Sequence, residues 1–290
     1  MIGAMQPLLS IVTVSLNAAA SIEDTIASVA LQRVDFDVEH VCVDGGSTDA
    51  TRSIIDRWAA RSNRIVRVYE PDTGIYDAMN KGLRAAHGQY VLYLNADDFL
   101  VAPDTLAGVF AGLTGRAGED PPDLILGDAV MGRLGHWGAW RHRLAPRVLG
   151  RWPGLGLYPL HQAQFTKCSL LIAVGGFSTG MRIAADVAQF YDLEQQFPLS
   201  VRFIRRDVAF MRAGGAANAG VRAMVRGTLE LFRHLSATRS PLRAAGMVLI
   251  KTLQSLAEVR CGRCPHARWF ATAIASQSPP AAYAERLAER

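Results

Sequence analysis

The sequence predicts an α/β protein whose sheet is mostly parallel and is covered by helices on both faces. Short β-rich segments alternate with segments of helical spacing over residues 8–94. The β-rich segments also end in polar or acidic residues, and ligands of open α/β sheets bind at the carboxyl ends of the strands. Half of the 290 residues are hydrophobic (50%), which is enough to bury a sizeable core. We therefore expect a ligand site at the carboxyl edge of the sheet.

The first two units are expected to be strand, loop and helix in turn. A strand over residues 8–16 runs into Asn17, and a helix follows over residues 21–30 with Ser21 as its N-cap. The second strand, residues 38–43, ends in Asp44, and the next helix is expected over about residues 52–61. Two glycines after Asp44 permit a tight turn and let a planar ligand approach the backbone.

A third strand is expected over residues 65–69, followed by a polar segment, a helix and the strand that begins at Tyr90. In this interpretation Asn80 and Lys81 lie at the opening of that helix. Two explanations stand for them: they contact a ligand, or they belong to an ordinary polar helical turn. Asp72 follows a proline and is typical of a turn.

The strand from Tyr90 delivers an amide and two adjacent carboxylates, Asn95, Asp97 and Asp98, to its own carboxyl end. Neighbouring carboxylates repel each other unless a cation or hydrogen-bond donors stabilise them. The motif therefore predicts a metal–diphosphate site. The alternative is a turn that leads into a helix cap.

With these motifs the chain resembles the family 2 glycosyltransferases. The matching segments are residues 10–17, 43–51, 74–82 and 94–98, together with His161-Gln162, Gly175-Gly-Phe177 and Ile183-Ala-Ala-Asp186. The resemblance covers roughly residues 8–216 and is strongest to the branch that builds bacterial surface polysaccharides and glycolipids. It implies a GT-A type nucleotide-diphospho-sugar transferase fold with a Rossmann-like sheet. It divides the chain into a domain over residues 1–220, with a nucleotide half at about 8–117 and an acceptor half at about 122–216, and an extension over 221–290.

The resemblance implies the donor-binding residues. Asp44 is expected to accept a hydrogen bond from the imide N–H of a uracil-type base, since a carboxylate offers only acceptors. Asp97 is expected to contact the ribose or the metal, and Asp98 to bind Mg2+ or Mn2+ directly, because hard cations prefer oxygen ligands. Further donor contacts are expected from Asn17, Asn80, Lys81 and Asn95. Asn95 stands where many relatives have an aspartate, so one negative charge is missing.

The acceptor side is expected in the second half of the chain. Asp186 aligns with the family carboxylate that takes the proton from the acceptor hydroxyl, although an acidic residue that favours a helix N-terminus explains it too. His161, Gln162 and Asp128 are expected near the acceptor or the diphosphate, and each of them also has a purely structural explanation. Gly214 and Gly215 are expected in a loop that closes over the diphosphate.

The C-terminal segment carries the net positive charge. Residues 221–290 contain eleven Arg or Lys against four Asp or Glu, so this segment contributes +7 to a total of +5. Helices are expected over 221–235, 241–259 and 280–290. Such basic amphipathic helices either lie on an anionic membrane or pack on the catalytic domain with their arginines in water. No apolar run reaches the roughly 20 residues of a spanning helix, and no secretory signal is evident, so a cytoplasmic protein is expected.

These observations predict a metal-dependent, inverting glycosyltransferase in cell-surface polysaccharide biosynthesis. The expected donor is a UDP-sugar, with GDP- and dTDP-sugars as alternatives, and the expected acceptor is a lipid-linked oligosaccharide or glycolipid. The alternative from another class is a nucleotide-sugar-binding subunit of an assembly complex that does not itself catalyse transfer. No recognised nucleic-acid-binding module accompanies the arginines, so no nucleic-acid partner is expected.

Overall fold

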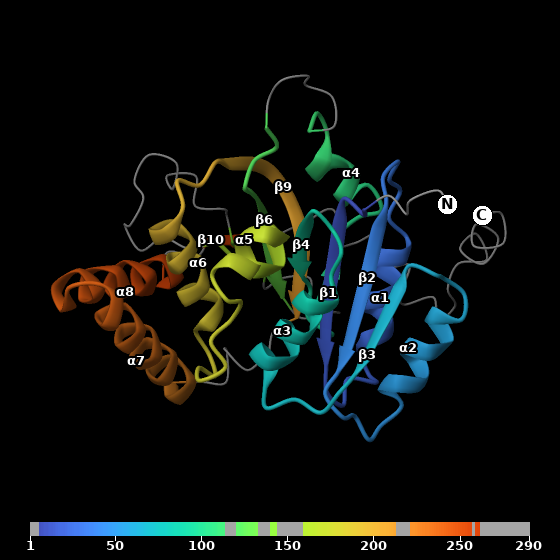
Figure 1. Cartoon of the computed structure of the whole chain (residues 1–290), viewed down its shortest axis with the longest axis horizontal. Helices are drawn as coiled ribbons and strands as arrows, with labels where there is room; N and C mark the ends of the chain where they lie inside the picture. Colours follow the sequence, from blue (N-terminus) through green and yellow to red (C-terminus); the bar gives the residue numbers. More distant parts are fainter. Residues whose placement is uncertain are drawn as a thin grey trace.

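The protein is described by a computed structural model over residues 6–113, 120–132, 140–143, 159–212, 221–256 and 259–261. Ten strands of these residues form one mixed sheet (Figure 1). Its parallel part has the order β3-β2-β1-β4. These strands are β1 (Leu9–Ser15), β2 (Val38–Asp44), β3 (Ile65–Tyr69) and β4 (Tyr90–Tyr93). The predicted α/β class is confirmed.

The second half of the chain continues this sheet with strands of mixed direction. β8 (Gln164–Lys167) is antiparallel to β4, and β6 (Leu124–Gly132) is antiparallel to β8. β9 (Val201–Arg212) runs parallel to β6 and also pairs with the short β5 (Phe99–Leu100). β7 (Trp140–Arg143) pairs with β6, and β10 (Val259–Cys261) pairs with β7.

Helices connect the parallel strands, as expected of right-handed βαβ units. Those of the first half are α1 (Ile22–Ala30), α2 (Thr51–Ala59), α3 (Ile75–Ala85) and α4 (Thr105–Phe110). Those of the second half are the 3-10 turn η1 (His161–Ala163), α5 (Cys168–Ala173) and α6 (Ala185–Gln196).

Side chains of β1 alternate between two cores, as a strand with both faces covered requires. Val12 and Val14 pack on the face that carries α3, α6 and the C-terminal helices, whereas Leu9 and Ile11 pack on the opposite face with α4. A third apolar cluster joins α1 and α2 to β2 around Cys42. The carboxyl ends of the parallel strands therefore meet at one edge of a rigid sheet.

The C-terminal helices pack on the face of the sheet that carries α3 and α6. α7 (Val221–Thr238) and α8 (Pro241–Leu256) form a hairpin at one end of the molecule, next to α6 (Figure 1). Leu231 and Leu235 of α7 are fully buried in the same core as α3 and α6. The outer face of the hairpin leaves Leu242 87% exposed and Leu249 59% exposed. The helix expected over 280–290 lies outside the described residues. None of the helices that the structure describes combines the length and apolar character needed to cross a bilayer.

Two local expectations were wrong. α3 begins at Ile75, directly after Gly74 at a φ of 144°, so Asn80 and Lys81 lie in the middle of the helix instead of at its opening. The apolar residues Tyr76, Met79 and Leu83 recur at helical spacing and bury one face of α3, which explains the earlier start. Ser21 occupies the N-cap of α1, but its hydroxyl makes no capping hydrogen bond.

Candidate functional site

Asp44 ends β2 and holds the loop that follows. Its Oδ1 accepts hydrogen bonds from the backbone N–H groups of Gly46 and Ser47, at 3.2 and 2.9 Å, and from Nε of Arg52 at 2.6 Å. Burial by itself raises the pKa of Asp44, but the hydrogen bonds from Ser47 and Arg52 outweigh it and lower that pKa below its usual value. The buried Oδ2 has no partner among the described residues. Asp44 is therefore ionised and keeps one acceptor atom for a ligand.

Asn17 joins this loop to the end of β1. It adopts a left-handed backbone with a φ of 51°, which asparagine tolerates better than most residues. Its Oδ1 accepts a hydrogen bond from the backbone N–H of Thr48 at 2.9 Å, and its own N–H donates to Oγ of Ser47 at 2.8 Å. Asn17 thus fixes the two predicted nucleoside-binding loops against each other.

Asp97 and Asp98 follow β4 in a turn closed by the hydrogen bond from the Asp98 N–H to the Asn95 carbonyl, 3.0 Å long. Asp98 is 3% exposed, and each of its carboxylate oxygens accepts a hydrogen bond. Oδ2 accepts from Nε2 of Gln162 at 3.1 Å, and Oδ1 accepts from the backbone N–H of Arg212 at 3.3 Å. Burial raises the pKa of Asp98 well above its usual value, and the charge of Asp97 adds to this effect.

The expectation that Asp98 is the direct metal ligand stays a prediction. Each of its carboxylate oxygens accepts one hydrogen bond and keeps a second lone pair, but the side chain is almost fully buried. Asp97 is only partly buried and has no side-chain hydrogen bond among the described residues, so it is the carboxylate of this pair that faces outward. The sequence pattern does not distinguish the two, because their burial is set by β9 and η1.

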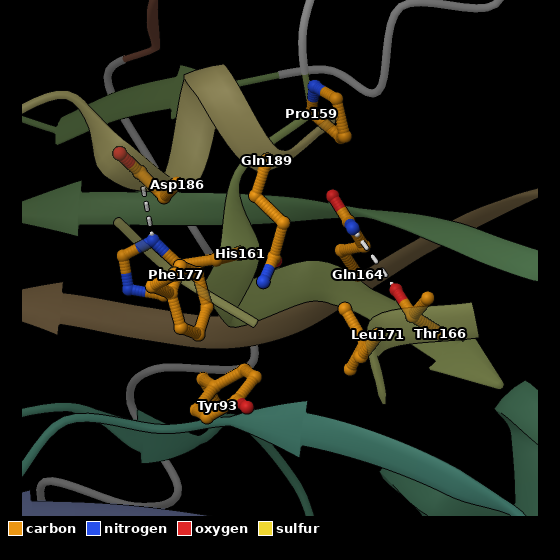
Figure 2. Close-up of a pocket in the computed structure, with 9 residues that line it drawn as sticks. All are labelled: Tyr93, Pro159, His161, Gln164, Thr166, Leu171, Phe177, Asp186 and Gln189. Carbon is orange, nitrogen blue, oxygen red and sulfur yellow. Dashed lines mark hydrogen bonds and ion pairs between the residues drawn. The ribbon is translucent and has the colours of Figure 1, made fainter. Parts of the chain in front are cut away.

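His161 connects the acidic turn to α6. Its Nδ1 lies 3.0 Å from Oδ2 of Asp186, and its Nε2 lies 3.5 Å from Nδ2 of Asn95. Figure 2 shows the imidazole ring beside Asp186, with the ion pair drawn between them. The neighbouring Gln162 binds Asp98, so η1 carries one contact to each part of the site. His161 and Gln162 are thus brought together with Asn95, Asp98 and Asp186, as the sequence predicted.

Asp186 lies in the first turn of α6 and is held from two sides. Its Oδ1 is 3.2 Å from Oη of Tyr76, which also donates to the Ile183 carbonyl at 2.8 Å. Burial would raise the pKa of Asp186, but the hydrogen bond and charge of His161, together with the Val187 N–H and Tyr76, hold that pKa below its usual value. Asp186 is therefore a carboxylate at neutral pH and can accept a proton.

Asn80 and Lys81 make structural contacts on α3. Asn80 donates from Nδ2 to the Phe177 carbonyl and accepts from the Phe177 N–H at Oδ1, both at 2.8 Å. Lys81 donates from Nζ to the Pro71 carbonyl at 2.6 Å and pairs with Asp77 at 3.2 Å. These contacts favour the structural explanation of both residues over direct donor binding.

Asp128 was expected at the end of a strand, but it lies within β6. It is 4% exposed and lies opposite Asp207 of β9. The strand extends to Gly132 because β7 and β9 both pair with its second half. Gly214 and Gly215 lie outside the described residues.

Two acidic residues that support the loops of the site were not assigned to it from the sequence. Asp72 lies so close to Gly45 that a β-carbon there would approach its Oδ2 within 1.8 Å, and its Oδ1 accepts from the Gly74 N–H at 2.9 Å. Glu230 of α7 accepts hydrogen bonds at Oε2 from the backbone N–H groups of Arg182 and Ile183, at 3.1 and 2.9 Å. Nothing in the sequence near Glu230 indicates this contact, because its partners are 47 and 48 positions away.

The chain is also similar in sequence to known proteins. A family model described as "Glycosyl transferase family 2" matches residues 10–187. A "PGL/p-HBAD biosynthesis glycosyltransferase" of Mycobacterium tuberculosis is 36% identical over 186 residues, which cover 62% of this chain and 67% of the relative.

Two solved structures are similar in fold. TarS of Staphylococcus aureus, residues 1–349 in complex with UDP-GlcNAc, has a TM-score of 0.57 at 17% identity and covers 86% of this chain and 72% of its own. The mannosyltransferase PcManGT of Pyrobaculum calidifontis, in complex with GDP-Man and Mn2+, has a TM-score of 0.56 at 21% identity. That match covers 98% of this chain and 84% of the mannosyltransferase.

Proposed function

Since this chain belongs to glycosyl transferase family 2, and is therefore a glycosyltransferase with a GT-A type fold, we propose that it is a metal-dependent, inverting enzyme that uses a UDP-sugar. The proposed acceptor is a hydroxyl group of a lipid-linked oligosaccharide or glycolipid. One observation carries this proposal: η1 joins the acidic turn after β4 to Asp186 through the contacts of His161 and Gln162.

The proposed reaction is a direct displacement at the anomeric carbon. The acceptor oxygen attacks that carbon, the bond from the carbon to the phosphate oxygen breaks, and nucleoside diphosphate leaves with the bonding electrons. Asp186 takes the proton of the attacking hydroxyl, because its lowered pKa keeps it ionised and an alcohol is a poor nucleophile at neutral pH. His161 and Tyr76 orient this carboxylate. Attack from the face opposite the leaving group inverts the anomeric configuration.

The donor atoms at the acidic turn suit a hard divalent cation. Asp97 offers a carboxylate, and Oδ1 of Asn95 is buried without a partner among the described residues. The described residues contain no group of three or more His, Cys, Asp or Glu side chains that could enclose an ion, so the ligand set would be completed by diphosphate oxygens. When bound, Mn2+ or Mg2+ would stabilise the negative charge on the departing diphosphate. PcManGT, which was solved with Mn2+, supports this part of the proposal.

The proposed nucleotide site is the loop around Asp44. Its free Oδ2 can accept one N–H, which uracil, thymine and guanine all present. We favour UDP because TarS is described in complex with UDP-GlcNAc, whereas PcManGT is described with GDP-Man.

The proposed acceptor class rests on the mycobacterial relative and on the outer face of α7 and α8. The relative is named for the biosynthesis of PGL/p-HBAD. Leu242 and Leu249 are exposed on α8, and Arg243, next to Leu242 in the sequence, is exposed as well. Exposed apolar side chains with a neighbouring arginine suit an anionic lipid surface, so we propose that the enzyme acts at the cytoplasmic face of a membrane.

A donor screen followed by a turnover assay tests this function. UDP-, GDP- and dTDP-sugars with Mn2+ are tested for an increase in apparent melting temperature, since ligands that bind only the folded state stabilise it. Release of nucleoside diphosphate is then measured with and without glycolipid acceptors. We expect Asp186→Asn to abolish release while donor binding stays nearly unchanged. The matched control is Asp37→Asn, which changes a side chain that is 63% exposed and lies before β2, at the opposite edge of the sheet.

Two results would overturn the proposal. Full turnover in Asp186→Asn would remove the assigned base. Donor binding without turnover in the wild-type protein, with every acceptor tested, would favour a nucleotide-sugar-binding subunit instead.

A further inference from the structure

A small polar pocket lies beside Asp186 and His161 on the side of β4 and β8. Figure 2 shows this pocket between α6 and the two strands. Gln189 reaches into it from α6, Tyr93 forms its floor on β4, and Phe177 and Leu171 supply apolar walls. Its free space is about that of one water molecule.

Two polar atoms in this pocket are buried without a hydrogen-bond partner in the part of the chain that the structure describes. They are Oη of Tyr93 and Nε2 of Gln189, on side chains that are each 4% exposed. Figure 2 shows the amide nitrogen of Gln189 pointing down past the His161 ring toward Tyr93. A buried polar group without a partner destabilises a fold, and native structures retain such groups mainly where they serve function or bind something.

The chemistry of the two atoms limits the kind of ligand that this pocket can bind. Burial raises the pKa of the Tyr93 phenol, so this group keeps its proton and can donate it. The Gln189 amide nitrogen is a neutral donor. Other polar groups of the pocket have partners: Nε2 of Gln164 donates to Oγ1 of Thr166 at 2.9 Å, and Nδ1 of His161 lies 3.0 Å from Oδ2 of Asp186. Two free donors in a space for one small group match a neutral oxygen acceptor.

We propose that this pocket is a subsite for a single hydroxyl group of the sugar ring held next to Asp186, and that Tyr93 and Gln189 recognise that hydroxyl group by donating hydrogen bonds to it. The inference rests on the proposed function, since it takes Asp186 to be at the transfer point. Either the acceptor sugar or the donor sugar can supply this hydroxyl, and the experiment separates the two.

The first measurement uses the protein without substrate. Tyr93→Phe removes only the unpartnered oxygen, so we expect an unchanged or higher melting temperature. Tyr90→Phe is the matched control on the same strand, because Oη of Tyr90 donates to the Pro122 carbonyl at 2.6 Å. Its loss should lower the melting temperature by roughly 2–4 °C. A comparable fall in Tyr93→Phe would mean that this oxygen stabilises the fold, and would overturn the proposal.

The second measurement compares ligands. In the donor arm, the affinity of the preferred UDP-sugar is compared with the affinities of its monodeoxy analogues, in the presence of Mn2+. In the acceptor arm, transfer to octyl glycosides is compared with transfer to their monodeoxy analogues. We expect wild-type protein to prefer one hydroxyl-bearing ligand over its deoxy form by at least about tenfold, and this ratio to approach one in Tyr93→Phe and in Gln189→Leu.

The arm in which the ratio changes identifies the sugar. If Tyr93→Phe leaves the ratios of both arms at their wild-type values, the pocket holds only water and the proposal fails. Absence of any transfer by the wild-type protein would instead contradict the proposed function, and the melting temperatures and the donor arm would still decide whether the pocket binds a hydroxyl.

Discussion

The contact between α7 and the segment before Asp186 predicts an unusual response to a glycine substitution. Gly227 lies on the buried side of α7, and a β-carbon at this position would be 2.8 Å from Cγ2 and 3.3 Å from Cβ of Ile183. Both atoms are near the backbone of a β-branched residue, so they cannot move aside cheaply. The Gly227→Ala substitution should therefore push α7 and the Ile183 segment apart.

The magnitude follows from two opposing effects. Overpacking of a core position costs about 1–3 kcal/mol. Alanine in place of glycine inside a helix contributes about 1 kcal/mol in the favourable direction. We therefore expect Gly227→Ala to destabilise the protein by between zero and about 2 kcal/mol. Gly246 of α8 is the matched control, because a β-carbon there meets nothing within 4 Å, and Gly246→Ala should stabilise by up to about 1 kcal/mol.

The assay is urea unfolding of the two variants and the wild-type protein, followed by nucleoside diphosphate release. Gly227→Ala should also lower turnover, because the Ile183 carbonyl accepts the hydrogen bond of Tyr76, which orients Asp186. Gly246→Ala should keep wild-type turnover. Equal stabilisation by the two substitutions would refute the close packing of α7 on the site.

Three further predictions follow from the described contacts. Glu230→Ala should speed hydrogen exchange at the amides of Arg182 and Ile183, measured by mass spectrometry, whereas Glu230→Gln keeps an acceptor and should slow it again; equal protection in all three proteins would contradict the assigned contact. Asp97→Asn should weaken the stabilisation by Mn2+ with UDP more than Asp98→Asn does in thermal-shift titrations, and the reverse order would identify Asp98 as the metal ligand. Burial lowers the pKa of His40 from 6.5 to about 4. Between these pH values the unfolded state binds more protons than the folded state, so the free energy of unfolding falls as the pH drops from 6.5 to 4, by roughly 3 kcal/mol in total. His40→Gln should remove most of this acid sensitivity in urea unfolding at pH 4.5 and 7, and an unchanged slope would exclude His40 as its source.

Local patterns in the sequence were enough to place most elements of the first half. The strand over residues 65–69 was predicted with the bounds that β3 has, because a short run rich in β-branched residues is bounded there by polar turns. The start of α3 was missed, since the motif around Asn80 was interpreted as a loop although Tyr76, Met79 and Leu83 have helical spacing. That error moved Asn80 and Lys81 to the end of a helix, where ligand contacts are common.

The candidate site shows the same division between local and distant information. The acidic turn was indicated by its residue types, whereas His161-Gln162 and Asp186 were indicated by their match to the family motifs; the structure brings them together. The burial of Asp98 was not foreseen, because it depends on Gln162 and Arg212, which lie 64 and 114 positions away. The sequence pattern did not single out Tyr93, because tyrosine is common in apolar strands.

The sequence by itself therefore determined the α/β class, the edge of the sheet at which the candidate site was expected and the identity of the family. These properties depend on periodicity and on short motifs, which are local. Only the tertiary structure decided which buried polar atoms have no partner among the described residues, such as Oδ2 of Asp44, Oη of Tyr93 and Nε2 of Gln189. It also decided that a C-terminal helix supports the backbone before Asp186 through Glu230. The physical reason is that burial and hydrogen bonding are set by segments that are far apart in the chain and meet only when the core packs.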